Sequence, residues 1–287
     1  MPSEQMQAFT AGFADAADKK KAGSIEEQRA ETDAFMGNQD VPSDILIDDF
    51  TLAGRPARKY FKAGVREDAT LLYLHGGGYR VGSLDSHQSF MAHLALACET
   101  AVNGLDYRLA PENPYPAALD DAIAAYQELL EYTAAEKIMI AGDSAGGGLT
   151  LACLQRIRDE GLPMPGCATL LSPHTDLTYS GESMGAVMRE AGLESARHYA
   201  GDLPTNTVGI SPVFGDMSGL PPLLIQVASN EDLLDDSTRV AQRASAAGVA
   251  VELQLIDDVF HVFQTLTFFP ESQQALADIG EFYNRHI

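Results

Sequence analysis

Basic residues are scarce in this chain. Lys and Arg number 19 among 287 residues, against 41 Asp and Glu, which leaves a formal net charge of −22. A protein this acidic repels phosphate backbones and anionic lipid surfaces. The charge therefore argues against nucleic acid and against a membrane as partners, and we expect the excess acid to cover solvated surface.

Cysteines and long apolar runs are also in short supply. Cys98, Cys153 and Cys167 are odd in number, fit no metal-ligand spacing and lie in apolar stretches, so they are expected to be small buried side chains. The first 30 residues contain no apolar run long enough for a signal peptide. No segment approaches the roughly 18 apolar residues that span a bilayer. These features predict a soluble, cytoplasmic protein.

Short apolar runs and amphipathic stretches alternate along most of the chain. Residues 45–53 and 57–63 alternate apolar and polar side chains, as half-buried strands do. Six later runs are continuously apolar and bounded by turn residues, which suits strands buried on both faces: 70–76, 100–107, 137–143, 167–172, 222–229 and 251–256. Helical spacing occupies 83–98, 114–132, 145–160, 235–248 and 270–286. The pattern predicts an α/β fold with a mostly parallel, eight-stranded sheet and helices on both faces.

Two regions depart from this alternation. The N-terminal residues look helical and detached, and region 174–210 interrupts the rhythm with glycines, charges and one helix-like stretch. An insertion after a strand of an α/β protein is often a lid over the site. We therefore expect an N-terminal helical cap segment at 1–44, a catalytic core at 45–173 and 211–287, and a cap insertion at 174–210.

The stretch AGDSAGGG places Ser144 between Gly142 and Gly146, after an apolar run and before a helical one. In that setting Gly-x-Ser-x-Gly predicts a nucleophile elbow, in which the serine occupies a strained strand-to-helix turn. The glycines are needed because a β-carbon there would clash with the neighbouring strand and helix. A flexible linker is the alternative, but linkers are not flanked by buried-strand and helix patterns.

A second glycine run, His75-Gly76-Gly77-Gly78, follows an earlier buried strand. A carbonyl attacked by serine becomes an oxyanion, which converging backbone N–H groups stabilise. We expect this oxyanion hole from the amides of Gly76, Gly77 and Ala145. A phosphate loop would carry Gly-Lys-Ser/Thr or Gly-x-Gly-x-x-Gly spacing, and neither is present. His75 is expected to brace the loop rather than to act as a base.

The general base for such a serine should be a histidine, and the chain has seven. In the fold implied here the order along the chain is serine, acid, histidine, which leaves His261 and His286. His286 is the penultimate residue, whereas His261 follows the last apolar run, where a loop can return the imidazole to the elbow. We therefore expect His261 to be the base.

The acid is less well defined by the residues alone. The loop after 222–229 contains Glu231, Asp232, Asp235 and Asp236, and one of them should accept a hydrogen bond from the imidazole. Asp235 and Asp236 are expected to cap the next helix.

Six segments carry a family resemblance: HGGGY at 75–79, DYRLAPENPYPAALDD at 106–121, GDSAGG at 142–147, SPHTDLT at 172–178, SGLPPLLIQV at 218–227 and FHVF at 260–263. In this order they resemble the hormone-sensitive-lipase-like esterases, the bacterial family IV of the α/β-hydrolase fold. The resemblance spans roughly residues 25–287 and is far more specific than the elbow alone. It implies that Ser144 is the nucleophile and His261 the base.

The family's acid usually opens an Asp-Pro-Leu-x-Asp segment. Here that segment begins at Glu231, and Leu233 and Asp235 match its later positions, so the resemblance implies Glu231 as the acid with Asp232 as the alternative. His174 stands where related sequences often have tryptophan. Arg108 and Glu112 are expected to brace loops under the site.

The resemblance implies a serine carboxylesterase that hydrolyses short- to medium-chain acyl esters through an acyl-enzyme intermediate. It implies a small ester as the partner and neither a metal nor an organic cofactor, and it allows a homodimer because related enzymes often pair through the last strand and helix. One alternative is hydrolysis of another acyl bond, in an amide, lactone or carbamate, on the same fold. The other is a non-catalytic small-molecule binding protein, which the presence of both Ser144 and His261 disfavours.

Overall fold

The computed structural model describes residues 2–17 and 23–287, and its centre is a single eight-stranded sheet. The strands are β1 Ile45–Leu52, β2 Arg55–Lys62, β3 Thr70–Leu74, β4 Ala101–Leu105, β5 Ile138–Asp143, β6 Cys167–Leu171, β7 Leu223–Ala228 and β8 Val251–Ile256. Their spatial order is β1-β2-β4-β3-β5-β6-β7-β8. Strand β2 is antiparallel to β1 and β4, and the remaining pairs are parallel. The eight strands and the mostly parallel sheet predicted from the sequence are confirmed.

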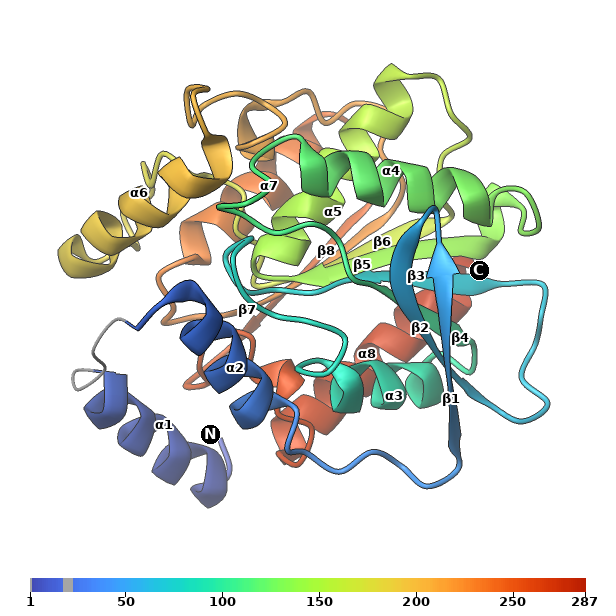
Figure 1. Cartoon of the computed structure of the whole chain (residues 1–287), viewed down its shortest axis with the longest axis horizontal. Coiled ribbons are helices and arrows are strands. Elements are labelled where there is room, and N and C mark those ends of the chain that lie inside the picture. The colour runs from blue at the N-terminus through green and yellow to red at the C-terminus, as the bar shows by residue number, and fades with distance from the viewer. Residues whose placement is uncertain (1, 18–22) are drawn as a thin grey trace.

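Helices cover both faces of the sheet (Figure 1). They are α3 Gln88–Ala97, α4 Ala117–Leu129, α5 Ala145–Asp159, α7 Leu234–Ala246 and α8 Pro270–His286. Helices α4, α5 and α7 pack in one apolar cluster with one set of strand side chains, while α3 and α8 pack in a second cluster with the alternating set. Along β3, for example, Leu72 belongs to the first cluster and Leu71 to the second. Three short 3₁₀ helices complete the core: Ala135–Lys137, Pro212–Phe214 and Phe263–Thr265.

Burial explains why the central strands read as continuous apolar runs. Every residue of β3, β4, β5, β6 and β7 is buried, because helices cover both faces of these strands. Strand β8 lies at an edge of the sheet, and along it partly buried residues alternate with more exposed ones. The three cysteines are buried, as expected.

Three further helices lie on one side of the molecule in Figure 1: α1 Glu4–Ala17, α2 Ile25–Met36 and α6 Ala186–Ala200. Helix α2 is held by Arg29, which donates to the carbonyl of Arg80 at 2.9 Å and pairs with Glu112 at 2.8 Å. Arg108 forms an ion pair with Asp121, with 2.7 Å between Nη2 and Oδ1. Glu112 and Arg108 therefore brace loops, as the sequence suggested. Parts of the N-terminal segment, residues 1 and 18–22, lie outside the described residues.

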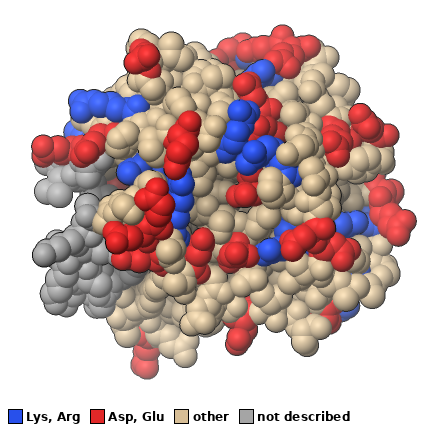
Figure 2. Space-filling view, viewed as in Figure 1, with Lys and Arg blue, Asp and Glu red and all other residues tan. Residues whose placement is uncertain are grey.

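Acidic side chains are spread over the face of the molecule shown in Figure 2, interleaved with fewer Lys and Arg. This distribution agrees with the expectation that the excess acid covers solvated surface. In the described part of the chain, no helix has the length and apolar character needed to cross a membrane.

Candidate active site

Ser144 occupies the sharp turn between β5 and α5. Its backbone has φ 49° and ψ −118°, a strained combination for a residue with a β-carbon. A β-carbon at Gly142 would meet the carbonyl oxygen of Gly146, and one at Gly146 would meet that of Leu74. The expected reason for both glycines is thereby confirmed. The turn is tied to the sheet because the Ser144 N–H donates to the Leu171 carbonyl at 2.8 Å.

His261 lies in the loop after β8 and spans the distance between the serine and a carboxylate. Its Nε2 is 3.0 Å from Ser144 Oγ, and its Nδ1 is 2.9 Å from Glu231 Oε1. An ionised carboxylate only accepts, so Nδ1 carries the proton and Nε2 is free to accept from the hydroxyl. Three sequence-predicted residues from the carboxyl ends of β5, β7 and β8 thus form one chain of hydrogen bonds.

Glu231, rather than Asp232, faces the imidazole. Its second oxygen accepts from Ser172 Oγ at 2.7 Å and from the Ala228 N–H at 3.1 Å, which fixes the carboxylate plane. Asp232 instead accepts from the Gly185 N–H at 3.0 Å. The geometry therefore favours Glu231 among the two acids that the sequence left open.

The electrostatics of His261 follow from this arrangement. Burial lowers the pKa of the imidazole, but the charge of Glu231 and the hydrogen bond to it outweigh that effect. The pKa of His261 is therefore raised above its ordinary value.

The glycine loop after β3 differs from the expectation at one position. The Gly76 N–H donates to Asp143 Oδ1 at 2.8 Å, so this amide is already engaged and its assignment to the oxyanion hole was wrong. Gly77 and Gly78 follow with φ of 120° and 62°, values that favour glycine, and Gly78 lines the cavity beside the serine. Ala145 is the first residue of α5, directly after the candidate nucleophile. Sequence reasoning missed Gly78, although it belongs to the same glycine run.

Asp143 is the second residue that sequence reasoning missed. It is buried at the end of β5 and accepts from Tyr73 Oη at 2.6 Å as well as from Gly76, while His87 Nε2 lies 3.4 Å away. Burial would raise the pKa of Asp143, but the neighbouring His87 and the hydrogen bond from Tyr73 together outweigh it, so the pKa is held below its ordinary value. A carboxylate inside a continuously buried strand, next to the candidate nucleophile, was the signal available in the sequence.

His75 braces the glycine loop, as expected. Its ring stacks on Tyr107 with 4.4 Å between centroids, and its Nδ1 is 2.8 Å from the Gly76 carbonyl oxygen. Burial lowers the pKa of His75 to about 4, so the ring is neutral near pH 7.

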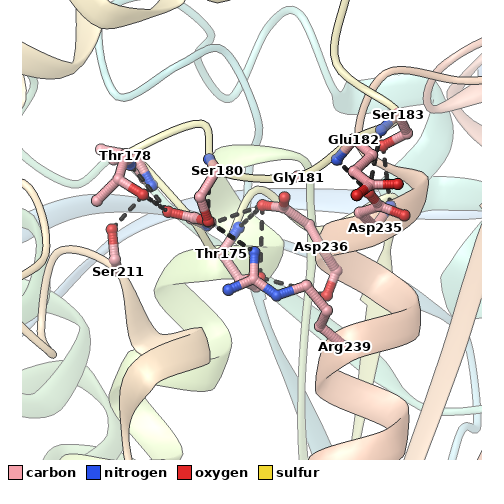
Figure 3. Close-up of polar contacts among 12 residues, drawn as sticks. Thr175, Thr178, Ser180, Gly181, Glu182, Ser183, Ser211, Asp235, Asp236 and Arg239 are labelled. Carbon is pink, nitrogen blue, oxygen red and sulfur yellow. Dashed lines mark hydrogen bonds and ion pairs between the residues drawn. The ribbon is translucent and has the colours of Figure 1, made fainter.

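Asp235 and Asp236 do not cap α7, contrary to expectation. The N-cap is Leu233, without a side-chain cap hydrogen bond. Asp236 Oδ2 accepts from the N–H groups of Thr175 and Asp176, at 2.6 and 2.8 Å, and Asp235 accepts from the N–H of Ser183 at 3.0 Å (Figure 3). The irregular segment after β6 leaves its backbone donors unpaired, so these carboxylates are turned toward it rather than toward their own helix.

A cavity of about 660 Å³ opens beside His261 and Glu231. Its wall comes from α1, the segment after β6, α6 and the loop after β8; lining residues include Thr10, His174, Met184, Ser195, Val259 and Phe260. In the described residues, no group of three or more His, Cys, Asp or Glu side chains is arranged to hold a metal ion.

A serine on a strand-to-helix elbow, joined to a histidine and a carboxylate at the carboxyl edge of this sheet, defines an α/β hydrolase. A family model of the alpha/beta hydrolase fold matches residues 71–265. The chain is 39% identical over 273 residues to an acetyl-hydrolase of Streptomyces hygroscopicus, covering 91% of this chain and 90% of the relative. It is 39% identical over 231 residues to an esterase of Acinetobacter venetianus, covering 77% and 76% of the two chains.

Solved structures agree with the sequence relatives. The crystal structure of an esterase from the bacterial hormone-sensitive lipase family matches with a TM-score of 0.95 and 38% identity, covering 100% of both chains. The protein belongs to the hormone-sensitive-lipase-like family of α/β hydrolases.

Proposed function

We propose that the protein is a serine carboxylesterase that cleaves uncharged esters of short- to medium-chain acids. The hydrogen-bond chain from Ser144 Oγ through His261 to Glu231, with distances of 3.0 and 2.9 Å, is the observation that carries this proposal. The relatives named acetyl-hydrolase and esterase support a small acyl group as the substrate.

In the first half of the reaction, Ser144 Oγ attacks the ester carbonyl while His261 Nε2 takes its proton. Glu231 stabilises the imidazolium that forms and holds the ring in the required tautomer. His261 then gives the proton to the leaving alcohol, which leaves an acyl group on Ser144.

The oxyanion of the tetrahedral intermediate is bound by backbone N–H groups. We assign this role to Gly77, Gly78 and Ala145, because the Gly76 amide is engaged with Asp143. Each such donor is typically worth about 3–4 kcal/mol of barrier. In the second half of the reaction, water activated by His261 attacks the acyl-enzyme and releases the acid.

Substrate size and charge follow from the cavity. We assign residues 1–44 and 174–210 to a cap, since Thr10, Met184 and Ser195 from these segments line the wall. A cavity of about 660 Å³ is large enough for an ester of moderate size. Glu231 and Asp232 in its wall disfavour esters that carry a carboxylate.

Two other functions are compared with ester hydrolysis: hydrolysis of another acyl bond, and binding of a small molecule without catalysis. Hydrolysis of amides, lactones or carbamates would use the same serine and histidine, because the fold does not fix the substrate. A binding protein would not need Ser144 Oγ at 3.0 Å from His261 Nε2, so that distance favours an enzyme.

The first test is a p-nitrophenyl ester series from acetate to palmitate, run on the wild-type protein and on Ser144→Ala. We expect hydrolysis that peaks between acetate and octanoate and is abolished by the substitution. Activity that survives in Ser144→Ala would contradict the assignment of the nucleophile. A folded wild-type protein that cleaves no ester would shift attention to amides and lactones, and then to ligand binding.

The homodimer that the family resemblance allows has a surface available in this chain. Strand β8 is an edge strand on which Leu255 is 52% exposed. Sedimentation velocity of the wild-type protein and of Leu255→Lys tests the pairing, since a charge at this edge should dissociate such a dimer.

A further inference from the structure

His174 forms part of the cavity wall immediately beside the nucleophile. It lies three residues beyond the end of β6, and its N–H donates to the Ser144 carbonyl at 2.8 Å, so its backbone is tied directly to the elbow. The imidazole ring lies 5.1 Å from the ring of Tyr179, centroid to centroid, and both residues line the cavity. A ligand that fills this cavity therefore lies next to His174.

The imidazole of His174 has an unmet capacity to form hydrogen bonds. The residue is 8% exposed, and among the residues that the structure describes neither ring nitrogen has a hydrogen-bond partner. Nε2 is enclosed by protein, so Nδ1 is the nitrogen that a ligand in the cavity can reach. Burial, followed by the charge of His261, lowers the pKa of His174 to about 4. The ring is therefore neutral near pH 7 and presents one donor nitrogen and one acceptor nitrogen.

The backbone that carries His174 is held firmly in place. Asp236 accepts from the N–H groups of the next two residues, Thr175 and Asp176. Asp176 in turn pairs with Arg239 at 2.7 Å. Thr175, Asp236 and Arg239 are labelled in Figure 3. Helix α7 thus anchors the segment from one side while Ser144 anchors it from the other. Because both anchors fix the backbone, the position of His174 in the cavity wall is preorganised.

The surroundings of the ring in the cavity are mixed in character. Met184, Leu233, Val259 and Phe260 supply apolar surface, whereas Glu231 and Asp232 supply negative charge. An anionic group on the substrate would be repelled by these acids. An uncharged hydroxyl can both donate and accept, so it matches the neutral imidazole in either tautomer.

We infer that His174 is a specificity-determining residue that hydrogen-bonds a hydroxyl group of the substrate, so that the preferred substrates are uncharged hydroxyl-bearing esters. This inference rests on the proposed esterase function. The hydroxyl belongs either to the acyl part or to the alcohol part of the ester, and the two sources give different results in the test.

The test compares pairs of esters in which a terminal hydroxyl replaces a terminal methyl group. On the acyl side the pair is ethyl butyrate and the ethyl ester of hydroxypropanoic acid with the hydroxyl at the chain end. On the alcohol side it is propyl butyrate and hydroxyethyl butyrate, and each pair is repeated with longer chains. The readout is the ratio of kcat/KM for the hydroxylated ester to kcat/KM for its apolar partner, followed by acid release at constant pH.

His174→Phe keeps a ring of similar size against Tyr179 but removes both nitrogens. We expect it to lower this ratio by about 3- to 10-fold in one of the two series, the range that corresponds to the loss of one neutral hydrogen bond. His174→Gln retains a donor and an acceptor and should keep most of the wild-type ratio. Met184→Leu, on the same wall, alters apolar shape without removing a polar atom and serves as the matched control, with an expected ratio close to wild type.

A drop confined to the acyl series places the hydroxyl on the acid, and a drop confined to the alcohol series places it on the leaving group. If the ratio is the same in wild type and His174→Phe in both series and at all chain lengths, the inference is wrong. If His174→Phe does not fold, His174→Leu takes its place, with His174→Gln as the polar counterpart. A wild-type protein that cleaves none of these esters would contradict the proposed function itself, whereas cleavage with an unchanged ratio contradicts only the role of His174.

Discussion

Two imidazole–carboxylate pairs lie close to the elbow, and they differ in what surrounds them. His261 and Glu231 are 2.9 Å apart, and His87 and Asp143 are 3.4 Å apart. Both carboxylate side chains are 3% exposed, but the His261 side chain is 40% exposed and that of His87 is 5% exposed. The first pair therefore places its histidine at the cavity, and the second keeps its histidine inside the protein.

The remaining contacts of each pair point to different uses. In the first pair the other ring nitrogen of the histidine, His261 Nε2, lies 3.0 Å from Ser144 Oγ. In the second pair the carboxylate holds the Gly76 N–H and the Tyr73 hydroxyl, while His87 Nδ1 lies 2.8 Å from Ser86 Oγ. A histidine–carboxylate pair can thus act as a candidate base where its histidine faces a serine hydroxyl. It can hold a loop in place where its carboxylate accepts from a backbone N–H group.

The largest expected effect comes from replacing the exposed histidine of the two. His261→Asn removes the proposed base, so kcat for p-nitrophenyl butyrate should fall by roughly 10⁵- to 10⁶-fold. The matched change, His87→Asn, should lower kcat by less than about 10-fold, because His87 contacts Asp143 and not the serine. Comparable losses in two folded variants, checked by circular dichroism, would mean that the two pairs do not divide their roles in this way.

Replacing the proposed acid comes next in size. Glu231→Gln keeps the side-chain shape but removes the charge that stabilises the imidazolium, and kcat should fall by about 10⁴-fold. Asp232→Asn is the control, because Asp232 contacts the Gly185 N–H rather than His261, and its kcat should stay within about threefold of wild type. A greater loss in Asp232→Asn than in Glu231→Gln would reverse the assignment of the acid.

The bracing carboxylate should have a smaller effect on the rate. Asp143→Asn weakens the hold on the Gly76 N–H and lets the glycine loop shift, so the proposed oxyanion donors lose alignment. We expect kcat to fall by about 10- to 100-fold with little change in KM, less than the loss of a complete oxyanion-hole donor. Steady-state kinetics measure kcat and KM, and the melting temperature measures any loss of stability in the same variant. A rate equal to that of wild type would show that the brace does not influence the reaction.

The smallest effect concerns pH. Because the pKa of His261 is raised by Glu231, the imidazole becomes protonated, and unable to accept from Ser144, as the pH falls through this raised pKa. In wild type kcat/KM should therefore decrease on the acid side of that pKa. Nuclear magnetic resonance titration of the imidazole should give a lower pKa in Glu231→Gln, and a smaller decrease in Asp143→Asn, because Glu231 contributes more to the shift than Asp143 does. Equal decreases of the His261 pKa in the two variants would contradict the larger contribution of Glu231.

The parts of the site that could be predicted from the sequence depend on local patterns. Strand ends are marked by apolar runs that stop at turn residues, so the positions of Ser144 and His261 at one edge of a parallel sheet followed from the order of the segments. The fold followed from the same alternation. The choice between Glu231 and Asp232 did not follow from the residues, because contacts with Ser172 and His261 orient the carboxylate.

The errors share a physical cause. The Gly76 amide is engaged by an aspartate 67 positions later in the chain, and Asp236 reaches backbone donors 60 and 61 positions earlier. Local rules for glycine loops and helix caps describe what a short segment can do by itself. They do not tell which distant donor or acceptor the completed sheet brings to it.

The short stretch 231–236 has a consequence for protein engineering. Glu231 is bound to His261, while Asp232, Asp235 and Asp236 are bound to backbone groups between residues 175 and 185. A chimera that imports a new segment 174–185 from a relative therefore has to import the matching 231–236 as well. The segments 174–185 and 231–236 therefore have to be replaced together. Replacing either one alone would disturb both the wall of the cavity and the orientation of Glu231.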